Sequence, residues 1–154
     1  MADPNNANPN AAASAPVLIV DDNEQNLELL EAYLEDLGVP IVTATDGQQA
    51  LDLAAKHKPA VVLLDVMMPR MSGFQACERL KKNEATRDVP VILVTALNEV
   101  ADQERGVEAG ADDFLTKPVN RLELLTRVRS LMKVSRLQTD LDAAQDEVRR
   151  LRDE

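Results

Sequence analysis

The sequence has few aromatic side chains and a single cysteine. Aromatic residues make up 2% of the 154 residues, tryptophan is absent, and Cys77 is the one cysteine. A lone cysteine excludes an internal disulfide, and because no basic residue directly flanks Cys77 we expect a buried structural thiol. The core must therefore be built from aliphatic residues within the 45% hydrophobic content. This composition suits a buried parallel sheet covered by helices.

Positive charge is also scarce, and long apolar runs are absent. The formal net charge is -10, which argues against a nucleic-acid partner because phosphate binding needs a basic stripe. No stretch approaches the ~20 apolar residues that a membrane-spanning helix needs. The Asn-, Ala- and Pro-rich residues 1–15 lack the basic start and apolar run of a signal peptide, and we expect them to be disordered. The sequence thus predicts a cytoplasmic protein without membrane contact.

Short apolar runs alternate with longer amphipathic stretches from Val17 onward. This alternation predicts an α/β domain with a doubly wound, five-stranded parallel sheet in the order 2-1-3-4-5. The length allows one domain, expected at 16–133. The expected strands are 17–20, 41–44, 60–64, 91–94 and 114–116, with 60–64 innermost, and the expected helices are 23–37, 47–56, a helix from 72–73, 100–109, and a helix from 120 onward.

The last of these helices is expected to extend well past the domain. Neither glycine nor proline interrupts about 35 residues from Asn120 to Glu154, whereas the mean helix has about 12. In 134–154, apolar residues recur at spacings of three and four, which is typical of a coiled-coil seam. The seam consists of Val134, Leu137, Leu141, Ala144, Val148 and Leu151. We expect a parallel homodimer; a solvated single helix and a different partner helix remain open.

Polar residues stand at the ends of four expected strands. They are Asp21 with Asp22, Asp65, Thr95 and Lys117, after strands one, three, four and five. Right-handed crossovers place these strand ends on one edge of the sheet, so the side chains should meet there. Carboxylates ~5 Å apart repel by on the order of 3 kcal/mol per pair at an effective dielectric of ~20. A cation must offset this repulsion, and the candidates are the Lys117 ammonium and Mg²⁺.

Four segments of the chain resemble the signatures of response-regulator receiver domains in two-component signalling. The segments are VLIVDD at 17–22, LLDVMMP at 63–69, VTA at 94–96 and DFLTKP at 113–118. The resemblance covers about 17–133 and is strongest to the receivers of diguanylate-cyclase response regulators. It implies a flavodoxin-like fold and a phosphorylation-dependent switch whose partner is a histidine kinase or phosphotransfer protein.

The resemblance also implies a role for each polar residue. Asp65 would accept a phosphoryl group from that partner or from a small acyl phosphate. Mg²⁺ would be held by Asp22, Asp65 and the backbone carbonyl of Met67, with Asp21 acting mainly through water. The phosphoryl oxygens would be contacted by Lys117, the Thr95 hydroxyl and the Ala96 amide, and the conformational switch would consist of Thr95 and Phe114.

Other classes of protein fit the sequence less well. An aspartate-nucleophile phosphatase has a second aspartate where this chain has Met67, and a nucleotide-binding protein has a glycine-rich loop where it has Asp21 and Asp22. A purely structural module would not need Lys117 and Thr95 at strand ends. We therefore expect no enzyme beyond one that catalyses its own phosphorylation and dephosphorylation. A fragment of a larger regulator such as a diguanylate cyclase, or a phosphorylation-independent adaptor, remains an alternative.

Overall fold

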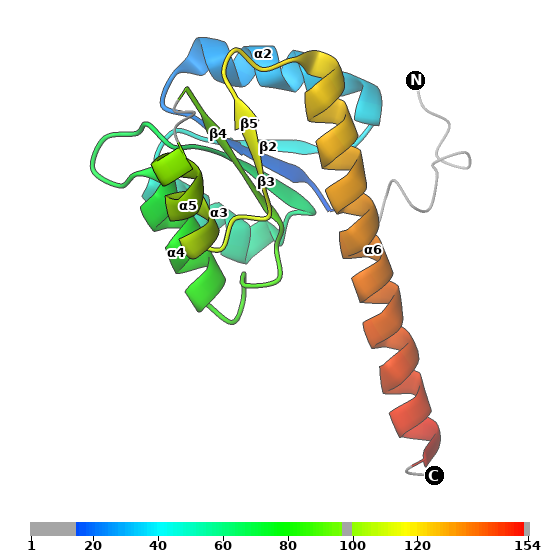
Figure 1. Ribbon diagram of the computed structural model, residues 1–154. Helices are drawn as coiled ribbons and strands as arrows, with labels where there is room; N and C mark the ends of the chain where they lie inside the picture. Colours follow the sequence, from blue (N-terminus) through cyan, green and yellow to red (C-terminus); the bar gives the residue numbers. More distant parts are fainter. Residues whose placement is uncertain (1–14, 97–99, 153–154) are drawn as a thin grey trace.

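The computed structural model describes residues 15–96 and 100–152, and it shows an α/β domain followed by a long C-terminal helix (Figure 1). The segment expected to be disordered lies outside the described residues except for Ala15. The elements along the chain are β1 (Val17–Val20), α2 (Glu24–Leu34), the 3-10 helix η2 (Glu35–Leu37), β2 (Ile41–Ala44), α3 (Gly47–His57), β3 (Val61–Asp65), α4 (Gly73–Lys82), β4 (Val91–Thr95), α5 (Val100–Glu108), β5 (Asp113–Thr116) and α6 (Arg121–Arg152).

The strands form one parallel, five-stranded sheet in the order β2-β1-β3-β4-β5. This order confirms the predicted doubly wound architecture and the innermost position of β3. Every residue of β1, β3 and β4 is buried, which explains why these strands read as continuous apolar runs. Their carboxyl ends are level, because Val20 pairs with Leu64 and Asp65 pairs with Val94.

Alternate residues of each strand enter two separate cores on the two faces of the sheet. Val62 and Leu64 belong to the core beneath α3 and α4, which also includes Ala109 just after α5. Val61 and Leu63 point the other way, into the core beneath α2 and α6. The sheet is therefore covered on both faces, as Figure 1 shows. Because both faces are covered, the polar residues at the carboxyl ends of the strands form the part of the sheet where chemistry can occur.

The first helix ends earlier than the sequence predicts. We expected it to reach Leu37, but α2 ends at Leu34 and the chain continues as the tighter η2. Gly38, with φ of 66°, closes this turn in the left-handed region, and its N–H donates to the carbonyl of Glu35. The tighter turn satisfies carbonyls that an α-helix would leave without partners at its end.

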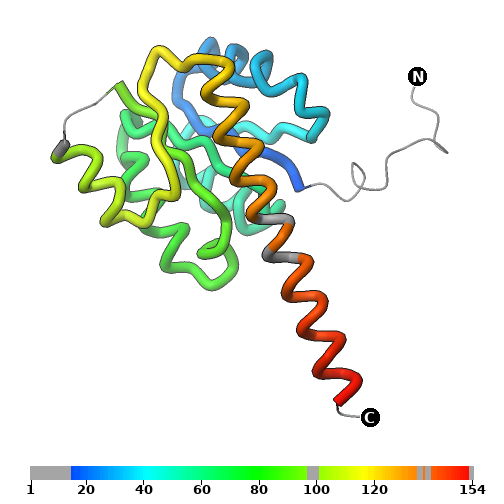
Figure 2. The backbone as a smooth tube through the Cα atoms, turned by 45° about the vertical axis from the view of Figure 1, so that its right-hand side comes forward, coloured from blue at the N-terminus to red at the C-terminus, as the bar shows by residue number. Residues whose placement is uncertain are grey.

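The C-terminal helix α6 is continuous from Arg121 to Arg152. Its first turns bury Leu124, Leu125 and Val128 and contact α2 and β3. Its later turns project from the domain, as two views 45° apart show (Figures 1 and 2). In the part of the chain that the structure describes, none of the helices combines the length and apolar character required to cross a bilayer.

Gly47 and Gly73 are the first residues of α3 and α4. They differ in what an added side chain would meet, and Gly73 is the one at which α4 approaches β3 closely. A Cβ on Gly73 would lie 2.3 Å from the backbone carbonyl oxygen of Asp65, whereas a Cβ on Gly47 would meet Met71, with Sδ at 2.6 Å. A methionine side chain can rotate away, but the end of a central strand cannot. We predict that Gly73→Ala lowers the thermal midpoint by several degrees and that Gly47→Ala lowers it much less, measured by calorimetry. Equal losses would contradict this.

Candidate functional site

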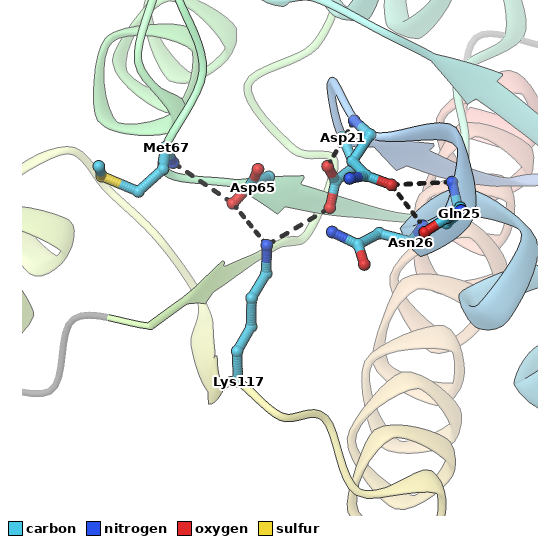
Figure 3. A network of polar contacts seen from close by, with 7 residues as sticks. Asp21, Gln25, Asn26, Asp65, Met67 and Lys117 are labelled. Carbon is cyan, nitrogen blue, oxygen red and sulfur yellow. Dashed lines mark hydrogen bonds and ion pairs between the residues drawn. The ribbon is translucent and has the colours of Figure 1, made fainter.

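The strand ends bring the predicted polar residues together at one edge of the sheet. Asp21 follows β1, Asp65 is the last residue of β3, and Lys117 follows β5. The Lys117 Nζ atom lies 3.2 Å from Asp65 Oδ1 and 3.5 Å from Asp21 Oδ2 (Figure 3). The topology alone therefore brings three residues from distant parts of the chain into direct contact.

Asp21, Asp22 and Asp65 form a compact carboxylate cluster. One oxygen of each lies within 4.8 Å of the others. Asp21 and Asp65 are buried, whereas Asp22 is exposed. The cluster is therefore closed to solvent at Asp21 and Asp65 and open to it at Asp22. Backbone amides orient the two buried members: the Asn23 N–H donates to Asp21 Oδ1 at 2.9 Å, and the Met67 N–H donates to Asp65 Oδ1 at 3.3 Å.

The electrostatics of the cluster show more negative charge than one lysine offsets. Burial raises the pKa of the Asp65 carboxyl above its ordinary value, and repulsion from Asp21 raises it further. Lys117 and the Met67 amide act in the opposite direction without cancelling the rise. Burial alone would lower the pKa of the Lys117 ammonium, but attraction from Asp65 and Asp21 outweighs burial and raises it. The site is therefore suited to a further cation.

The donor set fits Mg²⁺ better than zinc. Magnesium prefers a few carboxylate oxygens together with water, and the exposed rim at Asp22 leaves room for water. In 15–96 and 100–152, the clustered ligands are all aspartates, without the histidine or thiol that zinc favours. Cys77 is buried in the core with Sγ 3.5 Å from the carbonyl of Ala109, and burial raises its pKa to about 11. Cys77 is thus a structural thiol, as expected.

Thr95 and Phe114, the expected switch residues, lie on the same face of the sheet. Thr95 pairs with Thr116 and Leu93 pairs with Phe114 in the parallel register, and alternate residues of a strand share a face. Thr95 is buried and Ala96, next to it, is exposed. The Phe114 ring packs against α5, since a Cβ on Gly106 would lie 2.2 Å from ring atom Cε1.

Three contacts at or near the site were missed by the sequence reasoning. Gly106 provides the slot for the Phe114 ring, and Gly73 allows α4 to approach the backbone of Asp65. A glycine inside a helix costs about 1 kcal/mol relative to alanine, so the position of Gly106 within α5 was an available signal. The ion pair between Arg127 of α6 and Asp113 of β5, at 2.7 Å, had no such signal because charged residues are common on helix surfaces.

Comparison with known proteins identifies the family. Residues 17–129 match the response regulator receiver domain, and the chain belongs to that family. It is 50% identical over 120 residues to the response regulator PleD of Caulobacter vibrioides, an alignment covering 78% of this chain and 26% of PleD. It is 40% identical over 117 residues to the DNA-binding dual master transcriptional regulator RpaA of Synechocystis, covering 76% of this chain and 48% of RpaA. The chain thus spans about a quarter and about half of these relatives.

Solved structures agree with this assignment. The receiver domain of a sensor histidine kinase from Pseudomonas aeruginosa, determined with a magnesium ion in its active-site cleft, superposes with a TM-score of 0.72 at 32% identity. The alignment covers 78% of this chain and 98% of that domain. The chain is therefore a receiver domain of two-component response regulators, the class that works as a phosphorylation-dependent switch. Receiver domains bind Mg²⁺ in an acidic aspartate pocket, and the present cluster is compatible with one.

The raised pKa of Asp65 predicts how the stability of the metal-free domain depends on pH. Folding favours the protonated carboxyl, so this contribution to stability is present below the ordinary pKa of aspartic acid and is lost as the pH rises through the raised value. We predict that Asp65→Asn melts a few degrees above the unmodified chain at neutral pH with a chelator present, and that the difference shrinks in acid.

The matched control is Asp52→Asn, which removes an exposed aspartate from α3. This control should show no comparable rise in the thermal midpoint. If Asp65→Asn instead melts below the unmodified chain at neutral pH, the Asp65 carboxylate stabilises the fold, and the electrostatic description of the cluster is wrong.

Proposed function

We propose that this chain is a signalling switch that accepts a phosphoryl group on Asp65 from a histidine kinase, a phosphotransfer protein or a small acyl phosphate. The observation that carries the proposal is the position of the Asp65 carboxylate. It lies 3.2 Å from the Lys117 ammonium and within 4.8 Å of the carboxylates of Asp21 and Asp22. A nucleophile, a cation and a candidate metal site thus occupy one partly open edge of the sheet.

The proposed reaction is a direct phosphoryl transfer. A carboxylate oxygen of Asp65 forms a bond to phosphorus while the bond from phosphorus to the donor nitrogen or acyl oxygen breaks, and the electron pair leaves with the donor. A histidine donor then takes a proton from solvent. Lys117 neutralises charge that develops on the phosphoryl oxygens, and the Thr95 hydroxyl and Ala96 amide donate hydrogen bonds to them. The chain modifies only itself, and the phosphoryl donor is the other reactant.

The proposed magnesium site consists of Asp22, Asp65 and the Met67 carbonyl, with Asp21 acting through water. When bound there, Mg²⁺ supplies positive charge that the cluster lacks. The two buried members are already oriented by backbone amides, which supports a preformed site. Asp22, as the exposed member, is the residue that can be replaced with the least disturbance to the core.

The proposed relay runs from Thr95 to the face formed by α5, β5 and α6. When Thr95 moves toward a phosphoryl group, Phe114 moves toward the space that Thr95 leaves. The Phe114 ring rests in the slot at Gly106, so its movement alters the packing of α5. The neighbouring Asp113 is bound at 2.7 Å by Arg127 of α6, which connects β5 to the C-terminal helix.

The proposed setting is the cytoplasm, with a histidine kinase or phosphotransfer protein on the input side. On the output side we propose a second copy of the chain, bound through the C-terminal helix. A second candidate is that these residues form the receiver of a longer regulator, such as a diguanylate cyclase. The alignment covers 26% of PleD, and this partial coverage supports the second candidate.

We predict that the chain, incubated with Mg²⁺ and acetyl phosphate, gains one acid-stable, base-labile phosphoryl group. Intact-mass spectrometry measures it. Asp65→Asn should abolish the label because the nucleophile is lost, and Asp22→Ala should reduce it and weaken its dependence on magnesium.

Asp52→Asn serves as the control for removing an aspartate elsewhere, and it should label normally. Undiminished labelling of Asp65→Asn would place the phosphoryl group on another residue. Indifference of the unmodified chain to every donor would favour a phosphorylation-independent adaptor.

A further inference from the structure

The projecting part of α6 carries an apolar stripe that the domain does not cover. The exposed fractions are 57% for Val134, 58% for Leu137, 51% for Leu141, 50% for Val148 and 61% for Leu151. Both views show this part of the helix clear of the sheet and of the other helices (Figures 1 and 2). Large apolar side chains aligned on one face of an otherwise polar helix indicate a surface for another helix.

The residue types along the stripe favour pairing of two identical helices. In the heptad frame, Val134, Leu141 and Val148 occupy the a positions, and Leu137 and Leu151 occupy two d positions. The β-branched valines at a, together with leucine at d, favour a parallel coiled coil of two strands. The residue types in the stripe thus predict that the coiled coil contains two helices.

The charged residues beside the stripe distinguish the two possible directions of pairing. In a parallel pair, Glu147 lies opposite Arg152 of the second copy, and Asp140 lies opposite the second copy's Gln145. An antiparallel pair that aligns the whole stripe would instead bring Asp140 close to Glu147 of the second copy, at two symmetric places. All four side chains are exposed, and the ion pair that Glu147 makes with Arg150 of its own helix, at 3.2 Å, is also solvent-exposed. The parallel direction avoids the repulsion and gains an attraction.

We infer that α6 forms a parallel, in-register two-stranded coiled coil with a second copy of this chain, through the seam from Val134 to Leu151. The two receivers then lie at the same end of the coiled coil. The inference deepens the proposed output partner, but pairing itself does not depend on phosphorylation of Asp65.

The N-terminal part of α6, which packs on the receiver, shows where the coiled-coil seam begins. Carried back from Val134, the same frame meets Ser130 and Arg127, which are polar. Arg127 is bound within its own domain, to Asp113 at 2.7 Å and to Glu123 at 3.2 Å. With 3.6 residues per turn, Leu124, Leu125 and Val128, which pack on the receiver, lie on roughly the opposite side of the helix from the middle of the seam. The receivers therefore flank the coiled coil without blocking it.

Two adjacent alanines provide a matched test of the seam. Ala144 occupies a d position beside a shallow hollow lined also by Gln145 and Val148, whereas Ala143 lies on the outer face; both are exposed. We predict that Ala144→Leu lowers the dimer dissociation constant of the unphosphorylated full chain by about tenfold or more, because it fills the weak layer, and that Ala143→Leu leaves it unchanged. Sedimentation equilibrium measures both.

Substitutions that disrupt the seam should weaken the dimer. Leu141→Glu should convert the chain to a monomer at tens of micromolar, while Ala143→Glu should leave it dimeric. The inference is overturned if the unmodified chain and Ala144→Leu are both monomeric, or if the Ala143 and Ala144 variants behave alike. A failure here leaves phosphorylation of Asp65 intact, and a failure of labelling leaves the dimer intact, so the two proposals fail separately.

Direction is tested by disulfide formation. Leu151→Cys should form an interchain disulfide under mild oxidation, because parallel pairing places residue 151 opposite itself, and Arg150→Cys on the outer face should form much less. Cys77 does not interfere because it is fully buried. Crosslinking of a mixture of Val134→Cys and Leu151→Cys chains only to each other would show antiparallel pairing and overturn the inference.

Discussion

The repulsion between the buried carboxylates of Asp21 and Asp65 is the constraint on which the rest of the structure depends. An aliphatic sheet covered on both faces holds these groups together, and Lys117 is the one ammonium that contacts both of them in the described residues. Burial, and then repulsion from Asp21, raise the pKa of the Asp65 carboxyl. A domain that holds surplus charge in place is less stable in its empty state and has more to gain from a cation. This property suits a switch better than a scaffold.

The same crowding is the starting point of the proposed relay from the site to the C-terminal helix. In the proposed relay, a phosphoryl group adds charge and oxygen acceptors near the end of β4, where Thr95 is buried, and the Thr95 side chain moves toward it. In this proposal Phe114 leaves the slot at Gly106, in which its ring rests, and moves toward the space that Thr95 leaves. From β5 the connection continues through Asp113 and Arg127 into α6, which has no break before Arg152. In the proposed relay, a change at the base of this continuous helix reaches its projecting turns.

Much of this arrangement could be predicted from the sequence, because parallel topology converts strand ends into neighbours. The strand order and the meeting of Asp21, Asp65 and Lys117 followed from apolar runs and from the polar residues that end them. The 3-10 turn after Leu34 could not be predicted, because helix boundaries depend on how the last carbonyls find partners. The slot at Gly106 was also missed, because it depends on how helix α5 packs against the Phe114 ring of β5.

The central claim is that the acidic edge of the sheet is a preformed magnesium site around Asp65. A titration of the unphosphorylated chain with Mg²⁺, followed by amide chemical shifts in NMR spectra, tests it most directly. The account predicts saturable shifts concentrated at Asp21, Asp22, Asp65, Met67 and Lys117, and their loss when Asp22 is replaced by alanine. Shifts that do not saturate, or that fall mainly on the acidic surface of α2, would contradict the account.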